Sequence, residues 1–110
     1  MTSLRRSIDT LPRPVAAHAA KLREQLPYLR ERYGVASLAL FGSCVRAEAH
    51  EDSDIDVLVE FMPGQTPGLL KYVNLQHYLS DMLGKEVDLV MRDSLKPRIK
   101  KQVHQELVEI

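Results

Sequence analysis

The sequence lacks an excess of charge of either sign, a second cysteine and a long apolar run. Fifteen lysines and arginines balance fifteen aspartates and glutamates, so no overall positive field draws nucleic acid to the chain. The one cysteine, Cys44, excludes an intramolecular disulfide. No apolar stretch approaches the roughly 18 residues of a membrane span, and no basic start precedes an apolar signal segment. We therefore expect a soluble, cytoplasmic protein with neither a membrane nor a direct nucleic-acid partner.

What is present is an ordinary globular composition, 45% hydrophobic and 27% charged over 110 residues. This length suits one domain that buries its own core. Prolines and arginines interrupt a short apolar pattern at the start of the chain. We expect a loose N-terminal arm over residues 1–14 and a single domain over residues 15–110.

Apolar periodicity predicts the order of the elements. Spacings of three and four predict helices, and short apolar runs predict strands, the first of them buried and bounded by glycines. Pro27, inside the first helical pattern, predicts a kink or a restart there. In chain order we expect a helix over 14–33, a strand over 35–41, a short helix over 44–48, a strand over 55–61, a helix over 69–83, a strand over 86–91 and a final helix that Ser94 caps. This order indicates an α/β (α+β) fold, with helices packed on a small three-stranded mixed sheet.

Two polar motifs interrupt the apolar strands. Gly42-Ser43 follows the first strand, and Asp54-Ile55-Asp56 opens the second. Alternate residues of a strand share a face, so Asp54 and Asp56 project together, about 7 Å apart. A glycine lets a ligand approach the backbone, and the free N–H groups of a following helix favour an anion, as in a phosphate site. A plain Ser-capped turn and a solvated strand start are the alternatives that these motifs leave open.

A third carboxylate, Asp88, lies inside the apolar run of residues 87–91, where it needs a partner or a metal. If the second strand is antiparallel to the first and parallel to the third, one end of the sheet gathers Ser43, Asp54, Asp56 and Asp88. Close carboxylates repel one another unless cations hold them, and Mg²⁺ binds both carboxylates and phosphates. Two such ions about 4 Å apart clamp the oxygens of an in-line phosphoryl displacement. The pattern therefore predicts a metal-phosphate site.

Two basic features leave alternatives open. Arg46 falls one helical turn after Ser43, where it either neutralises triphosphate charge or pairs with Glu48 or Asp52 at the surface. The basic run over residues 92–101 either faces nucleotide phosphates, faces an acidic partner or forms a solvated helix face.

Taken together, the motifs resemble those of the polymerase β type nucleotidyltransferase superfamily, and more narrowly of the minimal nucleotidyltransferases. The resemblance rests on Gly42-Ser43, ten intervening residues, Asp54-Ile55-Asp56 and then Val87-Asp88 some thirty residues later. It covers residues 15 to 108. One departure concerns the loop: Arg46 is followed by Ala47, where many relatives have glycine, which leaves the local loop shape open.

The resemblance implies that Gly42 and Ser43 contact the nucleotide phosphates. It implies Asp54, Asp56 and Asp88 as ligands of two Mg²⁺ ions, with Asp88 also helping to deprotonate an acceptor hydroxyl. The implied reaction moves AMP from ATP to a tyrosine of a cognate HEPN ribonuclease toxin, with this chain as the antitoxin in a hetero-oligomer. Two alternatives stay open: a non-catalytic antitoxin that neutralises the toxin by binding, and a small-molecule nucleotidyltransferase.

Overall fold

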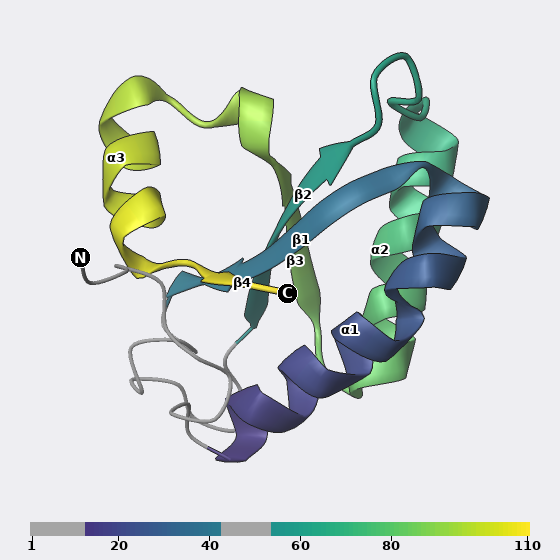
Figure 1. Ribbon diagram of the computed structural model, residues 1–110, viewed down its shortest axis with the longest axis horizontal. Helices are drawn as coiled ribbons and strands as arrows, with labels where there is room; N and C mark the ends of the chain where they lie inside the picture. Colours follow the sequence, from purple (N-terminus) through teal and green to yellow (C-terminus); the bar gives the residue numbers. More distant parts are fainter. Residues whose placement is uncertain (1–12, 43–53) are drawn as a thin grey trace.

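The computed structural model describes residues 13–42 and 54–110, which form a four-stranded sheet with helices on both faces (Figure 1). In chain order the elements are α1 (Arg13–Tyr33), β1 (Val35–Phe41), β2 (Ile55–Phe61), α2 (Leu69–Leu83), β3 (Val87–Met91), the 3-10 turn η3 (Arg92–Ser94), α3 (Pro97–Glu106) and β4 (Val108–Glu109). Within these ranges no helix has the length and apolar character of a membrane span.

The sheet is mixed, with the strand order β3-β2-β1-β4. β1 runs antiparallel to β2 and β4, whereas β2 and β3 are parallel. The predicted α/β fold and the predicted strand directions are confirmed, but the predicted number of three strands is wrong. The fourth strand, β4, is two residues long and pairs with Ala39 and Leu40. A strand of two residues is too short to produce an alternating pattern, which explains why the sequence did not reveal it.

Most predicted boundaries agree with the structure. The strands over 35–41 and 55–61 and the helix over 69–83 have the expected ends, while β3 begins one residue later than predicted. α1 continues through Pro27, so the predicted restart is wrong. Leu22 and Leu29, on either side of the proline, are both fully buried, and their packing holds the two parts of the helix on the same sheet face.

The last helix begins differently from the prediction. Lys96 is its N-cap residue and makes no side-chain cap hydrogen bond. Ser94 lies in the preceding turn η3, where its hydroxyl donates to the Met91 carbonyl oxygen at 2.8 Å instead of capping the helix. The predicted short helix over 44–48 and most of the predicted N-terminal arm fall outside the described residues.

The larger core layer lies between the sheet and the helix pair α1 and α2, which cover one face (Figure 1). Its members are aliphatic side chains that alternate along each strand or recur at helical spacing. The fully buried large ones are Leu22, Leu29, Leu38, Leu40, Leu75, Leu79, Val35, Val57, Val59 and Val87. This layer contains most of the apolar burial that stabilises the fold.

Within residues 13–42 and 54–110, the helix that covers the opposite face of the sheet is α3 (Figure 1). A small apolar cluster joins Ala39 of β1 and Leu58 of β2 to Val103 and Leu107 at the end of α3. Because neighbouring residues of a strand point to opposite faces, Ala39 lies on this side while Leu38 and Leu40 lie on the other. Asp56 lies on this face as well, two residues before Leu58 on the same strand.

Candidate active site

Three strands present one row of side chains at the end of the sheet where β1 stops. The register pairs Phe41 with Asp56, and Asp56 with Asp88. Paired residues share a sheet face, and adjacent strands lie about 4.8 Å apart, so Asp56 and Asp88 project side by side. Their face is that of α3, because Leu58, two residues along β2, packs against Val103. This placement requires β2 to be antiparallel to β1 and parallel to β3, and both directions are observed.

Gly42 places its backbone directly against Asp56. The glycine is buried and has a φ of 80°, in the left-handed region that side chains rarely adopt. A Cβ atom built at Gly42 would overlap the Oδ2 atom of the Asp56 carboxylate. The missing side chain therefore lets the chain turn sharply at the end of β1 and leaves room for the carboxylate beside that turn.

Asp54 directly precedes β2 and is exposed, whereas Asp56 is half-buried. The start of β2 is fixed by a hydrogen bond in which the Ile55 N–H donates to the Glu86 carbonyl oxygen at 2.9 Å. Glu86 lies two residues before Asp88. The bond therefore holds the segment that carries Asp54 beside the strand that carries Asp88.

Comparison with known families now adds to this geometry. A family model described as nucleotidyltransferase domain matches residues 22–110, a span that includes all three carboxylates. The chain belongs to the nucleotidyltransferase domain family. The nucleotidyltransferase is also similar to a solved structure of a minimal nucleotidyltransferase, with a TM-score of 0.69, 37% identity and coverage of 88% of this chain and 95% of the other.

Two further relatives carry more specific names. Protein adenylyltransferase MntA of Thermococcus cleftensis is 52% identical over 82 residues, which is 74% of this chain and 81% of that protein. A crystal structure of a toxin–antitoxin with AMP-PNP superposes with a TM-score of 0.64 at 26% identity, covering 79% of this chain and 69% of the other. The predicted membership in the minimal nucleotidyltransferases is confirmed.

The three carboxylates of this nucleotidyltransferase do not form a preassembled metal cage. Among residues 13–42 and 54–110, no group of three or more His, Cys, Asp or Glu side chains is placed to hold a metal ion. Mg²⁺ commonly takes one or two carboxylates and completes its octahedron with phosphate oxygens and waters. Asp56 and Asp88, side by side on one face, supply donors of that kind. The donor set therefore fits Mg²⁺ that a substrate phosphate shares.

Some predicted site residues have no described position. Ser43 and Arg46 lie in residues 43–53, outside the described ranges, as does Cys44. The assignment of Ser43 and Arg46 to the nucleotide phosphates stays a prediction. Of the predicted site residues, the described ones are Gly42, Asp54, Asp56 and Asp88, all at the same end of the sheet.

Tyr72 of α2 is a neighbour of the site that sequence reasoning missed. Its hydroxyl donates to the Leu89 carbonyl oxygen at 2.6 Å, and its ring packs against Phe61 with centroids 6.3 Å apart. Burial raises the pKa of Tyr72 above its ordinary value of 10.0, and the negative charge of Asp88 adds to the rise. Tyr72 is therefore a neutral donor at pH 7. Its role depends on how α2 packs against β3, which helical spacing alone does not encode.

Two serines act beside Tyr72 at the free edge of β3. The Val87 N–H donates to the Ser80 hydroxyl oxygen at 3.0 Å, and the Ser94 hydroxyl donates to the Met91 carbonyl oxygen at 2.8 Å. Side chains thus hydrogen-bond to backbone groups of β3 that point away from β2. This limits the addition of another strand at the edge and fixes the strand that carries Asp88.

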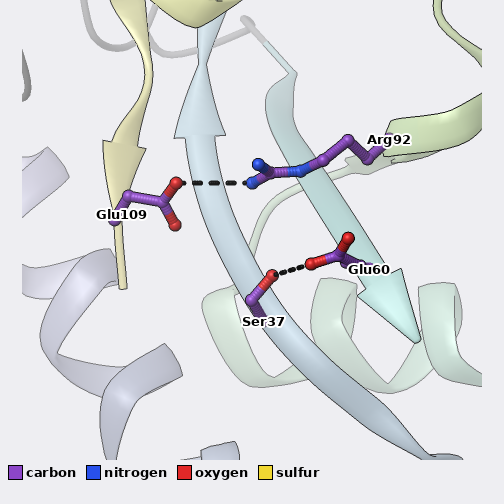
Figure 2. Close-up of polar contacts among 4 residues, drawn as sticks. All are labelled: Ser37, Glu60, Arg92 and Glu109. Atoms are coloured by element: carbon purple, nitrogen blue, oxygen red, sulfur yellow. Dashed lines mark hydrogen bonds and ion pairs between the residues drawn. The ribbon is translucent and has the colours of Figure 1, made fainter. Parts of the chain in front are cut away.

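We call Asp56 and Asp88 the carboxylate row. A polar cluster occupies the α3 face of the sheet beyond this row. Figure 2 shows the Arg92 side chain lying across β2, and its ion pair with Glu109 of β4 spans β1, with an Nη2 to Oε1 distance of 3.4 Å. Beside it, the Ser37 hydroxyl donates to the Glu60 carboxylate at 3.3 Å. Since β3 and β4 are opposite edges of the sheet, the Arg92–Glu109 ion pair ties these edges together. The cluster is structural and lies apart from the carboxylate row.

A surface hollow of about 280 Å³ lies between the second half of α2 and the residue before β3. His77, Ser80, Asp81 and Glu86 line it. Its lining contains none of the residues of the carboxylate row. The carboxylate row therefore does not form the floor of this hollow.

Proposed function

We propose that the protein transfers AMP from ATP to a tyrosine hydroxyl of a HEPN toxin and acts as the antitoxin. The observation that carries the proposal is the side-by-side placement of Asp56 and Asp88 next to the Gly42 turn. The name of the 52% identical relative, protein adenylyltransferase, supports the same reaction. The resemblance to a toxin–antitoxin structure with AMP-PNP supports a nucleotide substrate and a toxin partner.

In this proposal Asp54, Asp56 and Asp88 hold two Mg²⁺ ions. When bound, the ions neutralise phosphate charge and stabilise the attacking and leaving oxygens. Gly42 and Ser43 present the backbone turn to the phosphates, and Arg46 adds a positive charge there. Because a Cβ at position 42 would occupy the space of the Asp56 carboxylate, the glycine also leaves that carboxylate room to hold its position.

Asp88 acts on the acceptor. Its exposed carboxylate, on the edge strand β3, accepts the proton of the tyrosine hydroxyl as that oxygen attacks the α-phosphorus of ATP. The bond between the α-phosphorus and the bridging oxygen breaks, and pyrophosphate leaves with the electron pair. Tyr72 holds β3 through the Leu89 carbonyl and thereby keeps Asp88 in register with Asp56.

The same proposal places the protein in the cytoplasm, in a hetero-oligomer with its toxin. Residues 15–110 form its single nucleotidyltransferase domain, with residues 1–14 as an arm. The positions assigned to Ser43 and Arg46 belong to this proposal as well.

The test is Asp56→Asn, with Glu60→Gln as the matched control on the same strand and the same face. Both variants are incubated with Mg²⁺, ATP labelled at the α-phosphate and a HEPN protein, which is the proposed acceptor. We expect Asp56→Asn to lower the transfer rate by at least about a hundredfold, because a metal ligand is lost, and Glu60→Gln to leave it near that of the unchanged protein. Mass spectrometry then locates the modified residue.

The alternatives give different outcomes. Neutralisation of the toxin by Asp56→Asn, with the complex intact and no label transferred, would support masking by binding and contradict the enzymatic account. Label on a small molecule in the absence of the HEPN protein would indicate a small-molecule nucleotidyltransferase. Transfer that persists after chelation of Mg²⁺ with EDTA would contradict the assigned metal.

A further inference from the structure

The first turn of α3 is more exposed on its apolar side than the rest of the helix. Ile99, Val103 and Leu107 recur every four residues and form one apolar stripe. Val103 and Leu107 are 4% and 2% exposed against the sheet, whereas Ile99 is 44% exposed. The stripe therefore continues past the surface that covers it. We call Lys96, Arg98, Ile99, Lys100 and Lys101 the α3 overhang.

All four basic side chains of the α3 overhang are exposed, and no described carboxylate pairs with any of them. The first turn of α3 contains no acidic residue, and its N-cap makes no side-chain hydrogen bond. Cations at a helix start oppose the helix dipole, and Lys96 and Lys100 repel each other at a spacing of four. These charges weaken the helix locally, so helix stability does not explain them.

The α3 overhang also lies far from the carboxylate row. α3 starts after β3 and η3, and Met91 at the end of β3 pairs with Val59, three residues along β2 from Asp56. α3 ends beside the site, because Val108 pairs with Leu40 near the end of β1. The cations are therefore at the end of the sheet away from the row, which does not favour a role on the phosphates of a bound nucleotide.

The kind of partner follows from the composition of the surface. A single apolar side chain surrounded by cations is typical of a protein interface, with an anchor and a charged rim. α3 contains no Phe, Tyr or Trp on which a base could stack, and the whole chain has a formal net charge of zero. These features favour a protein over a nucleic acid.

We propose that the α3 overhang docks an acidic surface of the acceptor protein, with Ile99 entering an apolar recess between that protein's carboxylates. The inference rests on the proposed function in that the acceptor is the HEPN protein. Docking at one end of the sheet holds the acceptor while its tyrosine reaches Asp88 at the other.

The test measures binding without ATP, so that it does not depend on chemistry. The double variant Arg98→Glu/Lys101→Glu is compared with Lys21→Glu/Arg23→Glu, which changes the net charge equally at exposed positions of α1. Sedimentation and calorimetry give the Kd for the HEPN protein at low and high salt. We expect the α3 double variant to raise the Kd at least about tenfold at low salt and to lose most of the salt dependence.

The control variant Lys21→Glu/Arg23→Glu is expected to change the Kd by less than about twofold, because these charges lie outside the proposed interface. Ile99→Ala is expected to raise the Kd about fivefold at both salt concentrations, because it removes an apolar contact and no charge. Circular dichroism confirms that each variant is folded. An unchanged Kd for the α3 variants, or an unchanged protein that does not bind the HEPN protein, would overturn the docking proposal.

Two other occupants are tested in the same experiment. Binding of poly(U) RNA that the α3 double variant abolishes, without an effect on the HEPN protein, would assign the surface to nucleic acid and overturn the proposal. Self-association of this chain that the double variant removes would assign it to a second copy and overturn it too. Asp56→Asn that binds the HEPN protein normally but transfers nothing keeps the docking proposal separate from the proposed chemistry.

Discussion

The two faces of the sheet differ in what covers them. On one face α1 and α2 bury a continuous layer of aliphatic side chains, including Leu40 and Leu79. On the other face α3 covers only a small cluster around Ala39 and Leu58. The carboxylates Asp56 and Asp88, the Arg92–Glu109 ion pair and the half-exposed Ile99 are all on this second side.

This difference separates the main apolar core from the candidate site within one sheet. A strand that alternates strictly presents one side chain to each face, so β2 places Val57 in the apolar layer and Asp56 beside it on the open face. A carboxylate that faced the apolar layer would be desolvated, whereas on the other face Asp56 is half-buried and Asp88 is exposed. The site is therefore placed where little apolar packing is lost.

The largest expected effect tests the covered face. Leu40→Ala removes a fully buried side chain from the apolar layer and is expected to lower the free energy of unfolding by about 2 to 5 kcal/mol. Leu70→Ala, at a position 78% exposed on α2, is the control and is expected to change it by less than about 0.5 kcal/mol. Urea unfolding measures both.

Transfer activity sharpens this comparison. Below its unfolding transition, Leu40→Ala is expected to keep the transfer rate of the unchanged protein, because its side chain points away from the carboxylate row. A strong loss of activity in the folded variant, with little loss of stability, would show that the two faces are not separate.

Much of the fold was predictable because its elements have strong local signals. β1 and α2 have both the apolar spacing and the flanking glycines that set their ends, and β2 has an apolar run that follows a polar segment. β4 was not predictable, since two residues carry no periodicity. The capping role of Ser94 was predicted wrongly because a 3-10 turn separates β3 from α3, and propensity alone does not place such a turn.

The candidate site was predictable from spacing and strand directions. Asp56 and Asp88 come together because β2 and β3 are parallel, which the helix between them made geometrically natural. Neither the contact of Tyr72 with β3 nor the overhang of Ile99 was predictable. Both depend on the position of a helix along the strands of the sheet. The packing of the whole core sets this position, and the local sequence does not.

The next effect concerns the turn on the open face. Gly42→Ala is expected to lower the transfer rate by about ten- to a hundredfold, because the new Cβ overlaps the Asp56 carboxylate and displaces a reacting-site group. Gly84→Ala is a matched control, since Gly84 has a similar φ of 70° but open space around its would-be Cβ. Both variants share the backbone strain, so only the collision differs.

Stability and activity are measured on both glycine variants. Each is expected to lose about 1 kcal/mol of unfolding free energy from the left-handed backbone. Equal transfer rates in Gly42→Ala and Gly84→Ala would contradict the positioning of Asp56 by the turn. Backbone strain would then be the effect that the two variants share.

The smallest expected effect is at Tyr72, which joins the covered face to the strand that carries Asp88. Tyr72→Phe keeps the ring against Phe61 but removes the hydrogen bond to the Leu89 carbonyl, at an expected cost of about 1 kcal/mol in unfolding free energy. Tyr28→Phe, at an exposed ring, is the control and is expected to change little. A modest fall in kcat with an unchanged KM for ATP is expected if Tyr72 fixes Asp88 through β3.

The pH dependence of stability gives Tyr72 a signature of its own. Burial and the charge of Asp88 raise its folded-state pKa above the unfolded value of 10.0, so above pH 10 the unfolded chain ionises first. The stability that comes from the neutral phenol is full below pH 10 and is lost as the pH rises through the folded pKa. Thermal melts between pH 9 and 11 should show a steeper loss in the unchanged protein than in Tyr72→Phe, and identical slopes would mean that this phenol does not couple the α2 face to the strand of Asp88.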